Sequence, residues 1–287
     1  MKHIIAVVLN WNAADDTLAC VRSLLESGYE GLDVVVVDNA SSDDSVSRLR
    51  AELPDIPLLM RPSNGGYAAG NNAGIKYALE HAADYVLVLN NDVVVTRGFL
   101  DPMLAELEAD PTVALVTCDA RFQSDTSRPY PTGGRISWWR GAGVALSGPS
   151  RHERTLVDFV SGCILLMRRD LFEKVGFFDE SFFMYFEDVD YSRRVSRQFR
   201  MVYTPKATVY HRSGGGDAWS RQTPTYLYYM TRNRVRAFRD RSAFYRAYLV
   251  LVSFAAAVSK SVAILVGGGR RDQQLGALWR GFVAGAH

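Results

Sequence analysis

The sequence predicts an α/β fold with a mainly parallel central sheet, helices on its flanks and a helical C-terminal tail. Across residues 1–117, apolar runs rich in β-branched residues alternate regularly with segments of helical periodicity. The apolar runs are continuous, which is typical of parallel strands that helices cover on both faces. The chain has 287 residues, 48% of them apolar, so it is long enough for one large domain and a further region.

The strands and helices predicted for this first part follow one another in a simple order. The strands are 4–10, 33–39, 56–60, 85–90 and 113–117. The helices are 15–27, a helix capped by residues 41–44 that reaches about residue 53, 67–81 and 98–109. Ligands of such sheets bind beyond the carboxyl ends of the strands, so the residues that follow each strand are the first candidates for a site.

Residues 118–220 have a less regular pattern. The stretch 120–155 is rich in Gly, Arg and Trp and has no clear period, so we expect loops and a hairpin there. Beyond it, the pattern predicts a strand that runs into a short helix over 157–176, a helix over 187–198 and short strands over 201–211.

The C-terminal region differs from the rest of the chain in charge. Residues 1–220 contain 22 Lys and Arg against 29 Asp and Glu, whereas residues 221–287 contain 11 against 2. The tail begins with a predicted basic amphipathic helix over 226–246 and continues as an apolar segment over 247–269. Its arginines include Arg232, Arg234, Arg236, Arg239 and Arg241. Such a tail predicts contact with an anionic membrane surface.

The apolar segment is about long enough to cross a bilayer as a helix. Lys260 lies inside it, however, so a helix in the plane of the membrane surface fits better than a spanning one. Two alternatives stay open: packing of this helix on the protein's own body, and a contact between copies in a homo-oligomer. No nucleic acid is expected as a partner, because the apolar segment after the arginines suits lipid better than a groove.

The cysteines and the N-terminus bear on the compartment. Cys20, Cys118 and Cys163 are odd in number and widely spaced, which favours a reducing compartment over a disulfide framework or a structural zinc site. The apolar run at the N-terminus is short and ends in polar residues, so it is interpreted as a first strand and not as a signal peptide.

Polar clusters begin where three of the predicted strands end, at 10–12, 38–39 and 90–92. The carboxylate of Asp38 can accept hydrogen bonds from a base or a ribose, although an Asx-turn explains it equally well. Asp92 suits a hard divalent cation bound to a diphosphate, because such a cation needs only one or two protein carboxylates. A plain turn is the alternative at 90–92, and Asp38 in an equivalent place on a neighbouring strand favours the metal site.

The Gly-rich stretch 64–74 opens the third predicted helix but lacks the dinucleotide-binding pattern. Its glycines allow close approach of an anionic ligand to a helix N-terminus. Further along, Glu187 and Asp188 follow an aromatic cluster, where partial desolvation would raise a carboxyl pKa and favour a general base. Acidic residues that complement a helix dipole are the alternative. His211 ends a strand before a glycine loop and is a candidate metal ligand.

Together these stretches resemble the inverting family-two glycosyltransferases of the GT-A fold, particularly the bacterial rhamnosyltransferase-like branch. They occur in the family's order and cover roughly residues 3–215. The stretches are VVLNWN (7–12), VVVDNASSD (35–43), NGGYAAGNNAGI (64–75), LVLNNDVVV (87–95), VSGCILLMRRDLFEKVGFFDESFFMYFEDVDYSRR (160–194) and VYH (209–211). The N-N-D at 90–92 departs from the family's D-x-D pattern, because two of its three positions are amides.

The resemblance implies roles for individual residues. It places Mg²⁺ or Mn²⁺ on Asp92, with His211 as a second ligand, and makes Asp188 of the pair with Glu187 the catalytic base. The residues that it places around the nucleotide sugar are Asn10, Trp11, Asn12, Asp38, Asn39, Gly65, Gly66, Asn71, Asn90 and Asn91.

The resemblance also implies domains, a reaction and partners. A catalytic domain over 1–220, with a nucleotide-binding half over 1–117 and an acceptor-binding half over 118–220, would precede the tail. Sugar would pass with inversion from a nucleoside-diphosphate sugar to a glycan or a polyprenyl-diphosphate-linked acceptor. Deoxythymidine-diphosphate rhamnose is the favoured donor and uridine-diphosphate sugars are next. The expected setting is cell-surface polysaccharide synthesis on the cytoplasmic face of the cell membrane.

Two other functions are weighed against this one. A sugar nucleotidylyltransferase would need a Gly-rich signature with Arg and Lys after the first strand, where this chain has NWNAADD. A catalytically silent, membrane-associated scaffold that keeps a nucleotide-sugar site is the other alternative. The presence of Asp92, Asp188 and His211 speaks against it.

Overall fold

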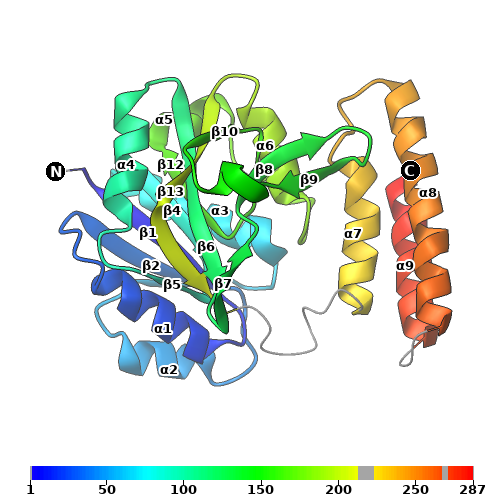
Figure 1. The fold of residues 1–287 in the computed structure, drawn as a ribbon. Helices are drawn as coiled ribbons and strands as arrows, with labels where there is room; N and C mark the ends of the chain where they lie inside the picture. The colour runs from blue at the N-terminus through cyan, green and yellow to red at the C-terminus, as the bar shows by residue number, and fades with distance from the viewer. Residues whose placement is uncertain (1, 213–222, 267–270, 287) are drawn as a thin grey trace.

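A computed structural model describes residues 2–212, 223–266 and 271–286 of the chain (Figure 1). The first part contains the predicted alternation of strands and helices, with small shifts at their ends. Its strands are β1 (Ile4–Asn10), β2 (Leu32–Asp38), β3 (Leu58–Met60), β4 (Tyr85–Asn90) and β5 (Val93–Val95). Its helices are α1 (Ala14–Leu25), α2 (Ser45–Glu52), α3 (Gly66–Glu80) and α4 (Leu100–Ala109).

The central sheet is parallel over most of its width, as predicted. Its strands run in the order β10-β13-β6-β12-β4-β1-β2-β3, where β6 is Val113–Phe122, β10 is Thr155–Val157, β12 is Ile164–Arg168 and β13 is Arg200–His211. Strands β4, β1, β2 and β3 are parallel to one another, and β13 is parallel to β6. Strand β12 lies antiparallel between β4 and β6, so the fourth and fifth predicted strands are not neighbours.

The second part contains more strand structure than the sequence pattern predicts. The stretch expected to form loops and a hairpin contains β7 (Asp125–Tyr130), β8 (Gly133–Ser137), β9 (Ala142–Ala145) and a short 3-10 turn, η1 (Gly148–Arg151). Strands β8 and β9 form a small second sheet with β11 (Phe159–Val160). After β12 come α5 (Arg169–Lys174) and α6 (Glu187–Val195). Strand β13 is one long strand with a register shift, instead of the short strands expected over 201–211.

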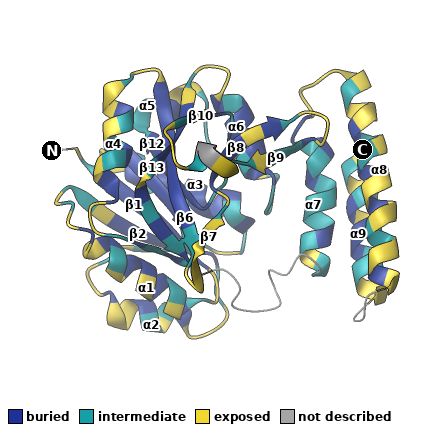
Figure 2. Ribbon diagram, viewed as in Figure 1, coloured by how far each residue is buried: buried dark blue, intermediate teal, exposed yellow. Residues whose placement is uncertain are grey.

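Helices cover both faces of the central sheet, and each face has its own apolar core (Figure 2). Helices α1, α2 and α4 pack on one face, and α3, α5 and α6 on the other. Helix α3 approaches β1 closely because glycines face the strand. A Cβ at Gly70 would lie 2.4 Å from Leu9 Cδ1, and one at Gly74 would lie 2.2 Å from Val7 Cγ1. These two glycines therefore serve helix–strand packing.

The C-terminal region forms α7 (Pro224–Arg236), α8 (Ala243–Val266) and α9 (Arg271–Ala286), which lie side by side (Figure 1). The prediction of one helix over 226–246 is wrong, because the chain turns between α7 and α8. Phe238 is buried in that turn, and the Ser242 hydroxyl accepts a hydrogen bond from the Tyr245 amide at the start of α8. Val235, Phe238 and Leu249 share an apolar cluster with Phe182 and Phe186, which attaches α7 and α8 to the preceding domain.

The arginines predicted to meet lipid phosphates contact protein atoms instead. Arg232 donates to the Ser181 carbonyl at 3.0 Å, and Arg236 donates to the Ser181 hydroxyl at 3.1 Å. Arg239 forms an ion pair with Asp179. Arg241 lies over the ring of Trp138, and Arg234 lines a small cavity between the three C-terminal helices. Arg232 and Arg236 of α7 therefore face the protein body, and no local pattern predicts this because the loop around Asp179 and Ser181 is far away in the chain.

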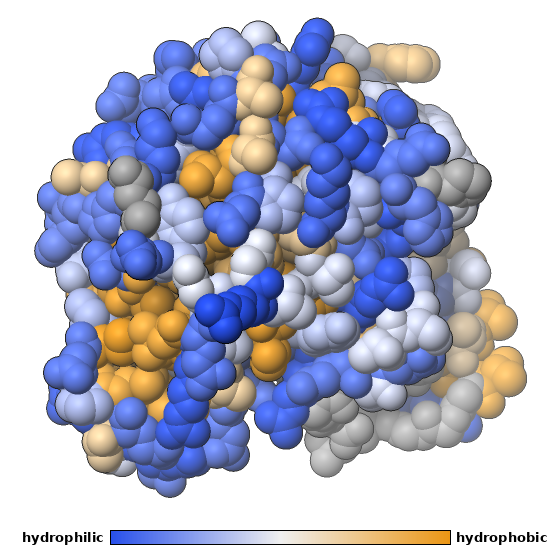
Figure 3. Space-filling view, turned by 60° about the vertical axis from the view of Figure 1, so that its left-hand side comes forward, coloured by the Kyte–Doolittle hydropathy of each residue, from blue (hydrophilic) through white to orange (hydrophobic). Residues whose placement is uncertain are grey.

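Helix α8 exposes an apolar face. By length and composition, α8 is a helix that could cross a membrane. Its most apolar 18-residue stretch has a mean hydropathy of 2.3, and only 22% of that stretch is buried. Its exposed apolar side chains are Phe244, Tyr248, Leu251, Phe254, Val258, Val262, Leu265 and Val266. The side of the preceding domain turned forward in Figure 3 is covered mostly by hydrophilic side chains, with a smaller apolar area at its lower left. The apolar surface of α8 is therefore unlike that of the domain.

Candidate active site

The first cluster of predicted site residues lies at the carboxyl ends of β1 and β2. Asn10 and Asp38 are opposite each other in the parallel register, and both are fully buried. Asn10 Nδ2 donates to Asp38 Oδ1 at 2.8 Å. Asp38 also accepts hydrogen bonds from the Ser41 hydroxyl at 2.6 Å and from the Ser41 amide at 2.9 Å. Asp38 thus binds the backbone of its own loop three residues further on, which is the pattern of a side-chain cap, and it holds Asn10 in place.

Hydrogen bonds of asparagine side chains connect the loops that follow β1 and β2. Asn12 adopts a left-handed conformation, with φ of 51°, and its Oδ1 accepts a hydrogen bond from the Ser42 amide at 2.8 Å. Asn39 is 2% exposed and donates to Asn64 Oδ1 at 2.9 Å. Trp11 is 48% exposed, so its ring is the accessible aromatic surface of this cluster.

The glycine-rich start of α3 packs against protein backbone. A Cβ at Gly66 would lie 2.0 Å from the Phe183 carbonyl oxygen, and Gly66 has a φ of 80°. A Cβ at Gly65 would lie 2.8 Å from Ala69 Cβ. Asn71 is fully buried in the second turn of α3, where its Nδ2 donates to the Tyr67 carbonyl at 3.0 Å. Within the described residues, Asn71 Oδ1 has no hydrogen-bond partner.

The second cluster lies at the turn between β4 and β5. Strand β5 leaves β4 and pairs with the end of β13, which places Val93 opposite His211. As a result His211 Nε2 lies 3.3 Å from Asp92 Oδ1 and 3.2 Å from Asn90 Nδ2. The His211 ring stacks on Tyr130, with 4.0 Å between ring centroids. Two residues predicted from segments more than a hundred positions apart therefore meet here.

Burial determines the charge states of this second cluster. It lowers the pKa of His211 to about 4, so the imidazole is neutral near pH 7 and has a lone pair to offer. Burial and the nearby Asp16 carboxylate raise the pKa of Asp92 to about 6. A neutral imidazole beside a carboxylate is a donor set that suits Mn²⁺.

These donors fit a cation that a ligand also helps to hold. No group of three or more His, Cys, Asp or Glu side chains arranged for a metal ion occurs among residues 2–212, 223–266 and 271–286. Asp92 and His211 alone would leave most of the coordination shell to diphosphate oxygens and water, which is the usual arrangement for a diphosphate-bound Mg²⁺.

Thr17 on α1 connects the two clusters, although the sequence analysis did not single it out. Its hydroxyl donates to Asn10 Oδ1 at 2.7 Å and accepts a hydrogen bond from Asn91 Nδ2 at 3.0 Å. Thr17 is fully buried. The Thr17 hydroxyl thus links the end of β1 to the β4–β5 turn. This role becomes visible only once β1 and β4 are known to be paired.

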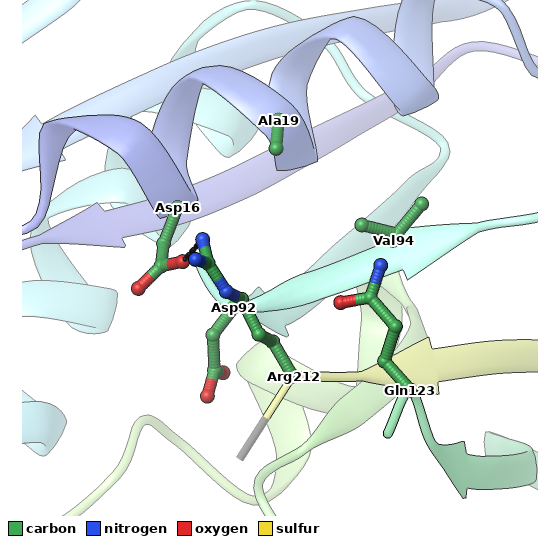
Figure 4. Close-up of a pocket in the computed structure, with 6 residues that line it drawn as sticks. All are labelled: Asp16, Ala19, Asp92, Val94, Gln123 and Arg212. Atoms are coloured by element: carbon green, nitrogen blue, oxygen red, sulfur yellow. Dashed lines mark hydrogen bonds and ion pairs between the residues drawn. The ribbon is translucent and has the colours of Figure 1, made fainter. Parts of the chain in front are cut away.

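A cavity of about 250 Å³ opens beside Asp92 (Figure 4). Arg212 extends across it and forms an ion pair with Asp16 at 2.5 Å. Val94 and Gln123 line the same cavity. Asp92 therefore borders open space on one side, while His211 covers its other side.

The third cluster contains the acidic pair at the start of α6. Asp188 Oδ1 accepts a hydrogen bond from the Val189 amide at 2.8 Å, and burial raises the pKa of the Asp188 carboxyl to about 6. Glu187 is 6% exposed, and burial and the neighbouring Asp188 raise its pKa well above its usual range. Glu187 Oε2 has no hydrogen-bond partner in the described part of the chain. The predicted desolvation of this pair is present in the structure.

Tyr130 contacts the second cluster through its stack on the His211 ring. Burial raises the pKa of its hydroxyl, and Cys163, Asp92 and Asp188 raise it further, so both carboxylates lie within electrostatic range of this one ring. Tyr130 belongs to the stretch that the sequence analysis assigned to loops and a hairpin, and its aromatic type was the only signal available. The predicted residues of β1, β2, β4, β13 and α6 are therefore brought to one side of the sheet, with Tyr130 among them.

Solved structures with the same fold are glycosyltransferases. The crystal structure of GalNAc-T7 with UDP, GalNAc and Mn²⁺ has a TM-score of 0.68 at 16% identity, over 87% of this chain and 50% of that one. The mannosyltransferase PcManGT from Pyrobaculum calidifontis, in complex with GDP-Man and Mn²⁺, has a TM-score of 0.64 at 18% identity, over 99% of this chain and 87% of that one. The predicted GT-A fold is confirmed.

Characterised relatives include two enzymes of glycan synthesis. An N-acetylglucosaminyl-diphospho-decaprenol L-rhamnosyltransferase of Mycobacterium tuberculosis is 31% identical over 62% of this chain. The low-salt glycan biosynthesis hexosyltransferase Agl10 of Haloferax volcanii is 26% identical over 67% of this chain. The matched region spans 66% and 61% of the length of these two relatives.

The family model for glycosyl transferase family 2 matches residues 5–176. This range extends from β1 through α5 and includes the first cluster and the β4–β5 turn with Asp92, whereas His211 and the acidic pair of α6 lie beyond it. Because the match covers more than half of the chain, the chain belongs to glycosyltransferase family 2.

Proposed function

We propose that this protein is a metal-dependent glycosyltransferase that moves a sugar, with inversion, from a nucleoside-diphosphate sugar to a hydroxyl group of an acceptor. The observation that carries the proposal is that Tyr130 stacks on His211, the neighbour of Asp92, and that both Asp92 and Asp188 raise the pKa of the same Tyr130 hydroxyl. A cation-binding carboxylate and a desolvated carboxylate near one ring are the two groups that this reaction needs.

In this proposal the first cluster binds the nucleotide. The Trp11 ring is exposed enough to stack on a base, and Asn12 and Asn39 have amide groups at the same edge. Asp38 is fully occupied by Asn10 and Ser41, so a contact between Asp38 and a base or ribose would require Ser41 to move. Gly65, Gly66 and Asn71 complete the predicted lining at the start of α3, and Asn90 and Asn91 complete it at the β4–β5 turn.

Asp92 and His211 would hold Mg²⁺ or Mn²⁺ against the diphosphate. When bound there, the cation supplies positive charge that stabilises the departing nucleoside diphosphate. The low pKa of His211 keeps this ring available as a neutral ligand near pH 7. Asn90 Nδ2 lies 3.2 Å from His211 Nε2, the ring nitrogen that also faces Asp92, so this contact would give way when Nε2 binds the cation.

Asp188 would act as the general base. It removes the proton from the acceptor hydroxyl while that oxygen forms a bond to the anomeric carbon, and the bond between that carbon and the diphosphate oxygen breaks. The electron pair of the broken bond leaves with the nucleoside diphosphate. Attack and departure on opposite faces invert the anomeric centre. A pKa of about 6 keeps Asp188 ionised near pH 7 yet more basic than an ordinary carboxylate.

The donor and acceptor are proposed from the relatives. The Mycobacterium tuberculosis relative is named as a rhamnosyltransferase that acts on a diphospho-decaprenol-linked sugar. We favour deoxythymidine-diphosphate rhamnose as the donor, with uridine-diphosphate sugars next, and a polyprenyl-diphosphate-linked glycan as the acceptor. Such a reaction belongs to cell-surface polysaccharide synthesis.

A donor panel tests this function. The purified full chain is incubated with Mn²⁺ or Mg²⁺, each candidate nucleotide sugar and a lipid-linked acceptor, and released nucleoside diphosphate is measured. We expect release from one class of donor that rises with acceptor and stops with EDTA. Nucleotide binding without release of nucleoside diphosphate from any donor would contradict the proposal and favour a catalytically silent scaffold. Full activity in EDTA would show that the reaction does not require a metal ion.

For location we propose a peripheral position on the cytoplasmic face of the cell membrane. The apolar face of α8 supports this, whereas the arginines of α7 are engaged by the protein. Arg246 lies near the start of α8 and adds positive charge beside the apolar face.

Flotation with liposomes tests the membrane proposal. The double variant Leu251→Gln with Val262→Gln should bind vesicles of phosphatidylglycerol at least about tenfold more weakly, because each buried apolar side chain is worth roughly 1.5–3 kcal/mol. Leu25→Gln changes an equally exposed side chain on α1 and is the control. If the double variant binds vesicles as well as the wild type does, or if it changes from dimer to monomer while vesicle binding is unchanged, the apolar face of α8 serves protein contacts.

A further inference from the structure

The turn before the acidic pair has an unfavourable backbone conformation. Tyr185 and Phe186 have φ angles of 64° and 70°, and neither residue is glycine. Left-handed backbone is unfavourable for residues other than glycine and persists only where the surrounding structure enforces it. Phe186 directly precedes Glu187, the first residue of α6. The direction in which α6 begins, and hence the position of Asp188, depends on this turn.

One side chain from α7 holds the turn. Asn233 is fully buried, and its Nδ2 donates to the Met184 carbonyl and to the Tyr185 carbonyl, each at 2.8 Å. Asn233 Oδ1 accepts a hydrogen bond from Arg232 Nε at 2.7 Å. Both donor protons and the acceptor of this amide are therefore engaged, and the amide has one orientation.

Contacts on both sides make the turn rigid. On the side of α3, the Phe183 carbonyl accepts a hydrogen bond from the Tyr67 amide at 2.7 Å, close to Gly66. On the side of α7, Phe186 packs in the apolar cluster that includes Val235. Among the hydrogen bonds of the described residues, only those of the Asn233 amide reach the carbonyls of Met184 and of the left-handed Tyr185.

Helix α7 also holds the other end of α6. Arg193 is 4% exposed and donates to Asp240 Oδ1 at 2.6 Å, just beyond α7. It also donates to the Ala237 carbonyl and lies over the ring of Phe238. The helix that carries Asp188 is thus fixed at its start by Asn233 and near its end by the turn after α7.

We propose that Asn233 is a positioning residue for the transfer reaction, which sets the place of Asp188 by holding the Met184–Phe186 turn in its left-handed conformation. This inference rests on the proposed role of Asp188. It assigns a part in positioning the active site to the C-terminal region. Asn233 supplies the donors that the turn cannot obtain from its own helix.

The experiment compares two buried asparagines that bind neighbouring segments. Asn233→Ala removes the donors to the turn, and Asn233→Asp keeps the size but sets an acceptor against two carbonyls. Asn72→Ala is the matched control, because Asn72 is 2% exposed and bonds Phe178 through both its amide nitrogen and its oxygen, outside the turn. The full chain is used, and kcat, donor KM, nucleotide affinity, Tm and hydrogen exchange are measured for each.

We expect kcat of Asn233→Ala to fall about 100-fold, the size of effect that a 1 Å displacement of a reacting group produces. Donor KM and nucleotide affinity should stay within about twofold, because the turn is not part of the nucleotide cluster. The acid limb of the pH–kcat profile should move to lower pH as Asp188 gains solvent. Asn72→Ala should lower Tm to a similar extent while keeping kcat, measured well below Tm.

Two outcomes would overturn the inference. One is a kcat of Asn233→Ala equal to that of the wild type, and the other is a kcat loss that follows Tm equally in Asn233→Ala and Asn72→Ala. If the wild type transfers no sugar, the proposed function fails, but hydrogen exchange still tests the contact. Faster exchange of the Val189 amide in Asn233→Ala, with no change in Asn72→Ala, then supports the inference that Asn233 holds the turn. An exchange rate in Asn233→Ala equal to that of the wild type rejects it.

Discussion

The strand-end clusters and the turn before α6 position their side chains in different ways. At the strand ends, the parallel register itself sets Asn10 opposite Asp38, and Leu9 opposite Asn90. Asp188 is not on the sheet. Its position depends on a strained turn that is held by α3 on one side and by α7 on the other.

The site therefore has two parts: a robust part, the strand-end clusters, whose geometry the sheet determines, and a conditional part, Asp188 and the turn before it, whose geometry depends on contacts with other helices. The proposed nucleotide cluster takes its geometry from strands whose side chains are buried on both faces, such as Val7 and Val36. The proposed base, Asp188, takes its geometry from a few hydrogen bonds between segments about fifty residues apart. Changes at the C-terminal helices should therefore affect catalysis before they affect nucleotide binding.

The largest expected effect tests the conditional part at its reacting group. Asp188→Asn removes the proton acceptor and keeps the size of the side chain, so kcat should fall by roughly 10²–10⁴. Nucleotide affinity should stay close to that of the wild type, because the nucleotide cluster is untouched. Kinetics with the donor found in the panel and nucleotide titration of the same variant measure both quantities.

Asp190→Asn is the control for this variant. It removes a carboxylate from the same turn of α6, one that forms an ion pair with Arg194 at 2.9 Å. It should lower stability and leave transfer nearly intact. Normal transfer by Asp188→Asn, or an equal loss in both variants, would show that Asp188 is not the base.

The position of the strand-end residues at one edge of the sheet could be predicted from the sequence, for a physical reason. Continuous apolar runs locate the parallel strands, and polar residues that follow them must share one edge of the sheet. Asn10, Asp38 and Asp92 could therefore be grouped before any coordinates existed. The meeting of Asp92 with His211 required the family resemblance as well, because β5 and β13 give no local sign of their pairing.

Other features depend on contacts that no local pattern encodes. The antiparallel β12 has the continuous apolar run of a parallel strand, since it too is buried on both faces. The tail arginines have the pattern of a membrane helix, yet Arg232 and Arg236 bond to Ser181. Asn233 stands among arginines and tyrosines, and only the folded chain reveals its contact with the turn.

An intermediate effect tests the place where the two parts touch. Gly66→Ala puts a Cβ 2.0 Å from the Phe183 carbonyl oxygen at a φ of 80°, so α3 or the turn must move. Gly176→Ala is the matched control, with a φ of 82° and no atom within 4 Å of the added Cβ. The control should lose about 1–2 kcal/mol of unfolding free energy, and Gly66→Ala about 1–3 kcal/mol more.

Urea unfolding measures this difference, and kinetics add a second comparison. Gly66→Ala displaces the turn, so its kcat should fall while Gly176→Ala stays near the wild type. Equal unfolding free energies for the two variants would mean that α3 and the Met184–Phe186 turn can move apart without a loss of stability. The strand-end clusters would then be independent of the base, in contrast to the contact seen in the structure.

The smallest expected effect concerns the buried partner of the base. The pKa of Glu187 is well above its usual range in the folded chain, so the folded state holds a proton that the unfolded state releases as pH rises above the ordinary glutamate value. The stability that Glu187 contributes is therefore complete at low pH and is lost as pH rises. Glu187→Gln keeps a neutral side chain at every pH. Its unfolding free energy should fall less between pH 5 and pH 8 than that of the wild type, as followed by urea titration. A pH dependence identical to the wild type would mean that Glu187 is ionised in place, and that the turn held by Asn233 admits water to the acidic pair.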